Sequence, residues 1–305
     1  MGSQSIEADV NEILFCYYLV DKSWNLFGNK DESQKELTVK KEKLKLDKIQ
    51  DLEQRSKEMA KVVKNWMDEN KCPKITKVWW LKATNETKYN ELVPDHIWQK
   101  YPADIIIETN ACKFGVSAKS SNSKNAKPPV KNPGLGTVLI TLGIKIDFDS
   151  KAKEQLKKKF PGIKFDKQWL RDPQNSRIRK ETIQTGKQVR LEICNSMYDE
   201  LKKKEQNGTL LDYILEEWFD IPRTPRYIKA WGYGQGKRFG AKIIDPLDTK
   251  KILEKMVLTV EKSGFSVIVK GKGKKLMGFR SKYESEQMAS GLKFSVDISA
   301  TIDFI

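Results

Sequence analysis

Three short segments of strand composition follow one another in the middle of the chain, and they constrain its fold more than any other feature. The segments span residues 75–81, 103–108 and 114–119, and polar turns such as Thr109-Asn110 separate them. Short runs of β-branched and aromatic residues between turn residues are typical of strands, and adjacent short strands usually pair. We therefore expect a sheet in which the second and third segments form a hairpin.

Helical patterns flank these segments. Apolar residues recur at helical spacing over 6–20 and over 46–66, and Pro73 ends the second pattern. A long helix is expected from about residue 176 to 204, and the turn at Asn207-Gly208 terminates it. Further helices are expected over 40–48, 151–159, 210–219 and 249–256.

The remaining apolar segments predict additional strands. Residues 227–233 and 239–244 flank a glycine-rich turn and are expected to form a second hairpin. Further strand segments are expected over 138–148, 257–261, 265–270, 276–279 and 292–298. The fold class that we expect is α/β (α+β), a helix-flanked mixed β-sheet with N-terminal helices and a β-rich C-terminal region.

The chain is long, highly charged and basic. Its 305 residues include 57 Lys and Arg against 41 Asp and Glu, a formal net charge of +16, and 38% are hydrophobic, which is enough to build a core. The longest apolar stretch, 13–20, is much shorter than the roughly 18 residues that a membrane-spanning helix needs, and no secretory signal pattern is present. We therefore expect a soluble cytoplasmic protein that does not enter a membrane.

Cysteine and histidine usage argues against two common classes of site. The four cysteines are widely separated, none of them in a C-x-x-C pattern, and His96 is the only histidine. A zinc site of the usual spacing therefore cannot be assembled. A serine-protease or cysteine-protease triad would require His96, whose setting between Pro94 and Trp98 is typical of a turn that enters packed structure.

The excess of positive charge predicts an acidic partner. Neutralising phosphates releases condensed counterions, so we expect the chain to bind nucleic acid, with DNA favoured over RNA. The alternative is ordinary solvated surface charge, which fits the Lys-rich helices. Loop residues are more informative, because glycine and small polar neighbours let a phosphate approach the backbone. The nucleic-acid-binding residues that we predict are Ser120, Lys124, Lys127, Lys131, Lys237, Arg238, Lys272, Lys274 and Lys275.

One constellation of residues can carry chemistry. Asp104 lies near the start of the second strand segment, and Ser117 and Lys119 lie two residues apart in the third. Side chains alternate along a strand, so Ser117 and Lys119 project to one face, and a hairpin places Asp104 beside them. The carboxylate can bind a divalent cation, while the lysine can orient or deprotonate a water molecule and neutralise charge that develops on a phosphate.

A helix, a strand, a strand with Pro102-x-Asp104 and a strand ending in Ser117-x-Lys119 follow one another in the chain. This order resembles the PD-(D/E)xK nuclease superfamily, which includes restriction endonucleases and related phage and viral enzymes, and the resemblance covers roughly residues 5–235. Asp104 and Lys119 match the motif of that superfamily. One residue is inserted between Pro102 and Asp104, and Ser117 stands where the superfamily has its second acidic residue.

The resemblance also predicts how the chain is divided. A nuclease-like core is expected over 1–245, and a β-rich C-terminal region that contacts DNA is expected over 246–305. Within the core we expect helices over 1–72, the β-rich region with the motif over 75–148, and a helix plus a hairpin over 176–245.

The resemblance further implies that another acid replaces the one missing at Ser117. Glu12 precedes the apolar run 13–20, so it either caps its helix near the N-terminus or points into the site. Glu192, beside the apolar stripe of a later helix, is the second candidate. Glu108 shares a strand face with the motif aspartate, but a surface acid at the end of a hairpin is the simpler interpretation.

Together these features predict a Mg²⁺- or Mn²⁺-dependent nuclease of the restriction type that hydrolyses DNA phosphodiester bonds. Asp104, Glu12 and a backbone carbonyl near Ala118 would hold the metal, and Lys119 would position the attacking water. The alternative is a protein of the same fold that binds nucleic acid without cutting it, with Ser117 marking a decayed site. A third class is an assembly protein that meets an acidic partner. The sequence leaves open whether two copies form a homodimer that cuts both strands.

Overall fold

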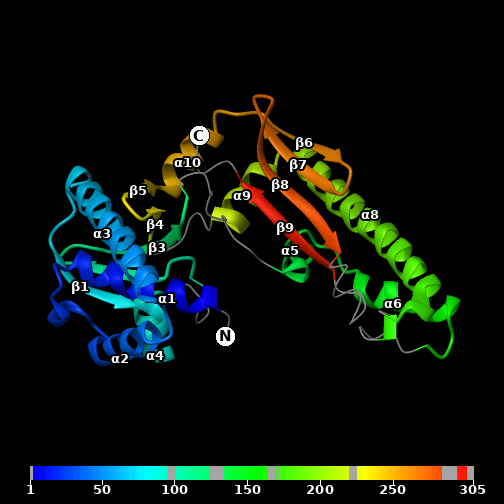
Figure 1. Cartoon of the computed structure of the whole chain (residues 1–305). Coiled ribbons are helices and arrows are strands. Elements are labelled where there is room, and N and C mark those ends of the chain that lie inside the picture. The colour runs from blue at the N-terminus through cyan, green and yellow to red at the C-terminus, as the bar shows by residue number, and fades with distance from the viewer. Residues whose placement is uncertain are drawn as a thin grey trace. The chain divides into compact units, whose positions relative to one another are not determined.

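The structure of the protein is a computed structural model that describes residues 3–94, 101–123, 134–163, 169–170, 172–219, 225–283 and 294–300. Helices and two β-sheets make up this part of the chain, which confirms the mixed α/β class (Figure 1). The chain divides into two compact units. Unit 1 comprises residues 1–128 with 220–250, and unit 2 comprises residues 129–219 with 251–305.

A five-stranded mixed sheet is the framework of unit 1. Its strand order is β1-β2-β3-β4-β5, and the neighbouring pairs are antiparallel except for β3 and β4, which run parallel. The two hairpins that the sequence predicts, β2–β3 and β4–β5, are confirmed. The strands are β1 (Ile75–Trp80), β2 (Ile105–Thr109), β3 (Lys113–Ser121), β4 (Tyr227–Gln235) and β5 (Arg238–Ile244).

One face of this sheet packs against the N-terminal helices. The buried side chains of Ile105 and Val116 belong to the same apolar core as Met59 of α3 (Leu46–Glu69), and α1 (Ser3–Leu19) packs alongside α3. Apolar residues at helical spacing line the sheet side of α3, as the sequence pattern predicts. None of the described helices is both long enough and apolar enough to cross a membrane.

The opposite face of the sheet has a separate apolar core. Ile106 and Tyr227 are buried there together with Tyr89 of α4 (Glu86–Leu92). Because side chains alternate along a strand, residues 115, 117 and 119 of β3 project from this face, whereas 114, 116 and 118 point to the helices. The other helices that contribute to unit 1 are α2 (Lys30–Lys41) and most of α10 (Pro246–Leu253).

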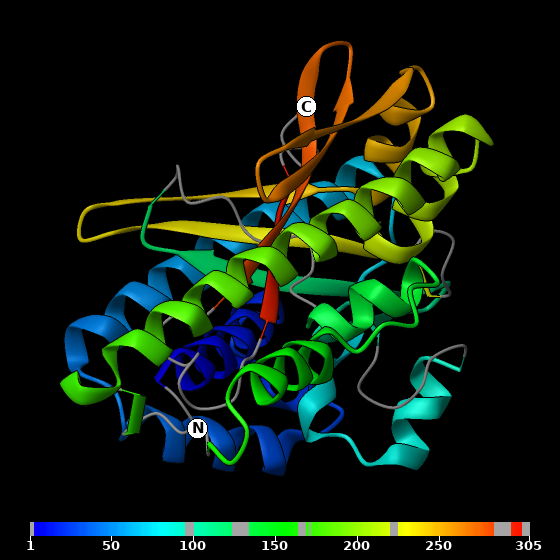
Figure 2. The ribbon, with the colours of Figure 1, turned by 90° about the vertical axis from the view of Figure 1, so that its right-hand side faces the viewer.

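Unit 2 combines a long helix with a four-stranded antiparallel sheet. The strands lie in sequence order, and α8 (Ser176–Gln206) packs across β6, β7 and β8. The fully buried Val189, Ile193 and Met197 form its apolar stripe. Figure 2 shows α6 beside α8. The remaining elements are β6 (Leu258–Ser263), β7 (Ser266–Gly271), β8 (Lys274–Tyr283), β9 (Phe294–Ala300), α5 (Leu135–Thr141), α6 (Phe148–Lys159) and α9 (Leu210–Phe219).

The prediction of a strand over 138–148 is wrong. Helix α5 occupies the first part of this segment, and α6 begins at Phe148. Leu135, Val138 and Leu142 are all buried, and their spacing of three and four residues is that of a helix face. The apolar composition of the segment suggested a strand, whereas its periodicity is helical.

The expected helix over 40–48 is also wrong in part. Helix α2 ends at Lys41 and α3 begins at Leu46, so the residues between them connect two helices.

The two units do not follow the predicted boundary after residue 245. Helix α8, which we expected in the core together with β4 and β5, belongs to unit 2. Its apolar stripe requires an apolar surface to cover it, and the sheet of β6–β9 provides that surface. Each unit is therefore built from two separate stretches of the chain.

Candidate functional site

Asp104 is the centre of a small polar group at one end of β2 and β3. Its Oδ2 accepts hydrogen bonds from Ser117 Oγ at 3.3 Å, from the Ala118 backbone N–H at 3.1 Å and from Lys119 Nζ at 3.1 Å. Ser117 is buried, whereas the side chains of Asp104 and Lys119 are 17% and 36% exposed. The carboxylate is fixed in place and still reaches solvent.

The register of the β2–β3 hairpin explains this arrangement. Ile105 pairs with Val116, and the Asp104 N–H donates to the Val116 carbonyl at 3.1 Å. Beyond this pair, the Ala118 N–H donates to the Asp104 side chain. Since the N–H and C=O of one strand residue point to the same side, the Ala118 carbonyl also faces this end of β2. The structure thus brings together the aspartate, serine and lysine of the motif.

Glu12, the first candidate for the missing acid, is buried on α1. Its Oε2 accepts a hydrogen bond from Trp80 Nε1 at 2.8 Å, and Lys82 Nζ donates to Oε1 at 3.0 Å. Trp80 is the last residue of β1, so the carboxylate is directed toward the end of the sheet. Because α1 begins at Ser3, Glu12 lies in the middle of the helix and does not cap it.

Three charged residues beside Glu12 were missed by the sequence analysis. Lys82 Nζ lies 2.7 Å from Asp9 Oδ1, and Lys40 Nζ lies 2.9 Å from Asp9 Oδ2. The signal for Asp9 was present in the sequence, because residues three apart on a helix share a face and Glu12 follows Asp9 at that spacing. For Lys82 and Lys40 the sequence carries no comparable signal, since they approach the acids from other elements.

Burial and like charge shape the electrostatics of this site. Burial of Glu12, together with the nearby charge of Asp104, raises the pKa of Glu12 to about 8 although Lys82 opposes the shift. Burial works against a charged Lys82, but the charge of Glu12 and a hydrogen bond to Asp9 outweigh it and raise the pKa of Lys82. The charge of Asp104 therefore disfavours the ionised form of Glu12, and a divalent cation bound beside Glu12 would favour it.

The donor set of the site fits a magnesium ion. Mg²⁺ needs only one or two carboxylates, because water and phosphate oxygens complete its coordination. Asp104 Oδ1 accepts no hydrogen bond from a described residue, and the Glu12 carboxylate, the Ser117 hydroxyl and the Ala118 carbonyl are further oxygen donors. In the part of the chain that the structure describes, no three His, Cys, Asp or Glu side chains are gathered as a metal site.

This carboxylate–lysine group has the composition of the predicted nuclease site. No protein-family model, curated protein or solved structure matches the chain. Membership of the PD-(D/E)xK superfamily therefore stays a prediction, carried by the residues of the motif and by their geometry.

Glu192, the second candidate for the missing acid, is not part of this group in unit 1. It lies on α8 in unit 2, and its Oε2 is 2.6 Å from Lys151 Nζ of α6. Of the two candidates, Glu12 is the one that lies in the same unit as Asp104, near enough for the charge of Asp104 to raise its pKa.

Glu108 lies at the other end of β2 and has structural partners. Its Oε2 accepts a hydrogen bond from Trp79 Nε1 at 2.9 Å, and its Oε1 lies 3.2 Å from Lys113 Nζ of β3. Partial burial opposes the ionised form, but these two contacts hold the pKa of Glu108 below its usual value. This carboxylate ties β1, β2 and β3 together.

The predicted nucleic-acid-binding residues lie in several places. Ser120 is exposed on β3, and residues 237–238 are exposed at the β4–β5 turn of unit 1. Lys272 lies in the β7–β8 turn of unit 2, where Gly273 has a φ of +75°, and Lys274 and Lys275 are the first residues of β8. Lys124, Lys127, Lys131 and His96 lie outside the described residues.

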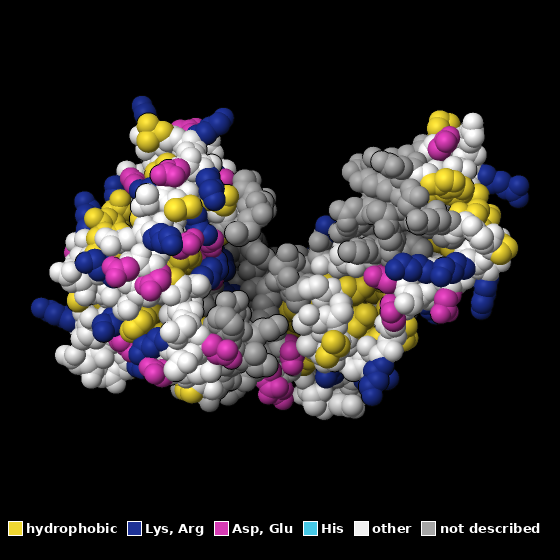
Figure 3. All heavy atoms as spheres, turned by 90° about the horizontal axis from the view of Figure 1, so that it is seen from below, with side chains coloured by type: hydrophobic (Ala, Val, Ile, Leu, Met, Phe, Trp, Pro, Cys, Tyr) yellow, Lys and Arg dark blue, Asp and Glu magenta, His cyan; other side chains and the backbone are white. Residues whose placement is uncertain are grey.

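The surface of unit 1 carries charges of both signs. On the face at the left of Figure 3, Lys and Arg side chains are interspersed with Asp and Glu side chains. Several charged side chains of unit 1 are paired, as in Lys64 with Asp21 at 2.6 Å and Lys48 with Glu7 at 2.8 Å. Much of the positive charge of this unit is thus the mixed surface of an ordinary folded protein.

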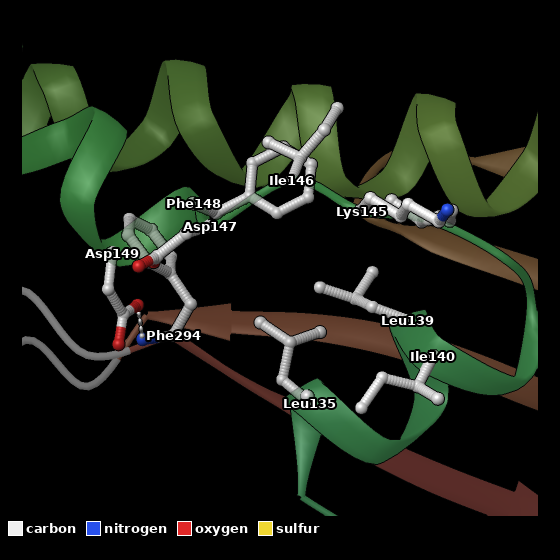
Figure 4. Close-up of a pocket in the computed structure, with 11 residues that line it drawn as sticks. Leu135, Leu139, Ile140, Lys145, Ile146, Asp147, Phe148, Asp149 and Phe294 are labelled. Carbon is white, nitrogen blue, oxygen red and sulfur yellow. Dashed lines mark hydrogen bonds between the residues drawn. The ribbon is translucent and has the colours of Figure 1, made fainter.

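Unit 2 contains a hollow of about 440 Å³ with a largely apolar lining. Leu135 and Leu139 of α5 border one side and Phe148 borders the other (Figure 4). At its edge, Asp149 Oδ1 accepts a hydrogen bond from the Phe294 N–H at 3.2 Å. These residues suit packing with an apolar group better than contact with a phosphate.

Proposed function

We propose that the protein is a metal-dependent nuclease that hydrolyses phosphodiester bonds of DNA at the Asp104 group. The contact of Lys119 Nζ with Asp104 Oδ2 at 3.1 Å is the observation that carries this proposal. It sets a carboxylate that can hold a divalent cation one hydrogen bond away from an ammonium group that can meet a phosphate. The buried Glu12 carboxylate supplies the second acid that the motif lacks at Ser117.

Each side chain has a role that its contacts support. Asp104 and Glu12 would hold the metal together with the Ala118 carbonyl, while Trp80 and Lys82 fix the Glu12 carboxylate. When bound, Mg²⁺ polarises a phosphoryl oxygen and lowers the pKa of a water molecule. Lys119, which is partly exposed, orients the attacking water and offsets the negative charge that develops on the phosphate.

Incubation of the purified protein with supercoiled plasmid tests this proposal. We expect nicking or linearisation with Mg²⁺ or Mn²⁺ and none with EDTA, and a parallel reaction with single-stranded DNA defines the substrate. A fixed pattern of fragments would support a restriction-type endonuclease. Intact plasmid under every metal condition would contradict the proposal.

A non-catalytic protein that binds nucleic acid is the second candidate function. The observation that favours it is Ser117, a buried hydroxyl residue at the position where the motif has its second acid, so that β3 supplies no carboxylate to the site. The same reaction separates the two functions. A binder shifts the plasmid in a gel in the presence of EDTA as well as Mg²⁺ and leaves it uncut in both.

A further inference from the structure

The N-terminal half of α8 has an outer face on which exposed basic side chains gather. Arg177, Lys180 and Lys187 lie on this face at spacings of three and seven residues, and all three are exposed. We call these three residues the basic face of α8. Gln184 is exposed among them and is neutral. The face lies opposite the buried stripe of the helix, because residues 182, 185 and 189 are buried on the other side.

The acids of this half of the helix are used elsewhere. Glu181, one turn after Arg177, and Glu192 lie toward α6, where they pair with Lys159 Nζ at 3.0 Å and Lys151 Nζ at 2.6 Å. No described residue forms an ion pair with any member of the basic face. The basic side chains of the outer face thus form no ion pair with a described residue along about 15 Å, the rise of ten helical residues.

The C-terminal half of the same helix shows what an ordinary solvated face looks like. Lys202 Nζ lies 2.7 Å from Glu205, and Lys203 Nζ lies 2.6 Å from Glu200. Lysines and acids alternate there within one turn and neutralise each other. The separation of charge in the N-terminal half is thus a feature of that half and not of the whole helix.

The chemistry of the face favours nucleic acid over a lipid surface. A helix that binds a membrane buries an apolar face among the lipids, but the apolar stripe of α8 is already covered by β6, β7 and β8. Lysine, arginine and glutamine side chains are among the groups that contact phosphates and sugars along a duplex. We propose that the basic face of α8 binds the phosphate backbone of duplex DNA without reading its sequence. This inference takes its ligand class from the proposed function but does not depend on cleavage.

The salt dependence of binding tests the proposal. Affinity of the full chain for a labelled duplex is measured in EDTA at several salt concentrations, for the wild type and for the variant Arg177→Gln/Lys180→Gln/Lys187→Gln. Each phosphate contact contributes about 0.9 to the slope of log affinity against log salt, so the slope should fall by roughly 2 to 3 in magnitude. All three side chains are exposed, and an unchanged melting temperature verifies the fold of the variant.

A matched variant on the same helix is the control. Lys202→Gln/Lys203→Gln/Lys204→Gln removes the same charge and should leave the slope unchanged, because two of these lysines already have acidic partners. Equal slopes for the wild type and the basic-face variant would overturn the proposal. Equal losses in the two variants would also overturn it, because net charge alone would then explain the effect.

Two further readouts separate this inference from competing outcomes. Binding to phosphatidylserine vesicles that falls only in the basic-face variant, with unchanged DNA binding, would overturn the proposal in favour of a lipid surface. A wild type that does not cut plasmid but binds duplex through this face would contradict the proposed nuclease function and keep the inference. Plasmid cleavage by the wild type, together with an unchanged slope in the basic-face variant, would support the nuclease function and overturn this inference.

Discussion

Packing alone does not explain why a carboxyl group occupies position 12. A carboxyl group that is 2% exposed loses its hydration, and its partners are one indole N–H and one ammonium group. An apolar residue of similar size would occupy this position without that cost, since a buried ion pair is weak ground for stability. A role as a ligand for a cation gives the acid a purpose that its contacts with Trp80 and Lys82 do not.

Replacing Glu12 therefore separates a ligand from a structural residue. Glu12→Gln keeps the shape of the side chain but cannot ionise to bind a cation, so we expect the Mg²⁺ concentration for half-maximal cleavage to rise by about tenfold or more. Glu7→Gln, on the same helix, is the matched control and should leave that concentration unchanged. A lower melting temperature with unchanged metal dependence would rule out Glu12 as a ligand.

The pKa of Glu108 predicts a pH-dependent contribution to stability. Its pKa is lower in the folded protein than in the unfolded chain, so its contribution is present above the unfolded value and is lost as the pH falls through the folded value. We expect Glu108→Gln to lower the melting temperature at pH 7 and to have little effect near pH 3. A difference between the wild type and the variant that stays constant over this range would contradict the assignment.

At the scale of elements, the sequence predicts the strands better than it predicts the charge network between them. Alternation along β3 is a local property, so the common face of Ser117 and Lys119 follows from residue order alone. The network of Asp9 and Lys82 joins a helix to the end of β1, and such contacts between distant segments leave little trace in one sequence. The strand prediction for 138–148 was wrong because the apolar composition of the segment suggested a strand, whereas its apolar residues recur at helical spacing.

Gly115 on β3 offers a test of how tightly the site hairpin is packed. A methyl group there would overlap the Tyr101 ring and approach the Ala103 Cβ to 2.8 Å. Gly115→Ala should therefore cost about 1 to 3 kcal/mol of stability, the range expected for overpacking a core. Gly136→Ala in α5, where nothing lies within 4 Å of the added atom, should be neutral or stabilising in the same thermal melt. Equal melting temperatures of the Gly115→Ala variant and the wild type would show that this strand can shift.

At the scale of the whole molecule, the chain crosses between its two units more than once. The predicted boundary after residue 245 followed the order of the sequence, whereas the units are defined by which apolar surfaces cover one another. The net charge of +16 likewise belongs to the whole chain, and many of its lysines pair with acids, so the DNA binding that we propose rests on basic side chains such as those of the basic face of α8, which form no ion pair with a described residue. Composition alone predicts an acidic partner, whereas the structure shows which basic side chains pair with acids of the described residues and which do not.

Two carboxylate–lysine pairs on the same hairpin provide the most direct test of the central claim. Asp104 with Lys119 and Glu108 with Lys113 both link β2 to β3, at 3.1 Å and 3.2 Å. The initial rate of plasmid cleavage in Mg²⁺ is measured for Asp104→Asn, Lys119→Ala, Glu108→Gln and Lys113→Ala. The account predicts that the first two variants lose cleavage by a factor of at least about 100, as expected when a group that acts on the transition state is removed, while the last two keep it. Cleavage at the wild-type rate by Asp104→Asn and Lys119→Ala would contradict it.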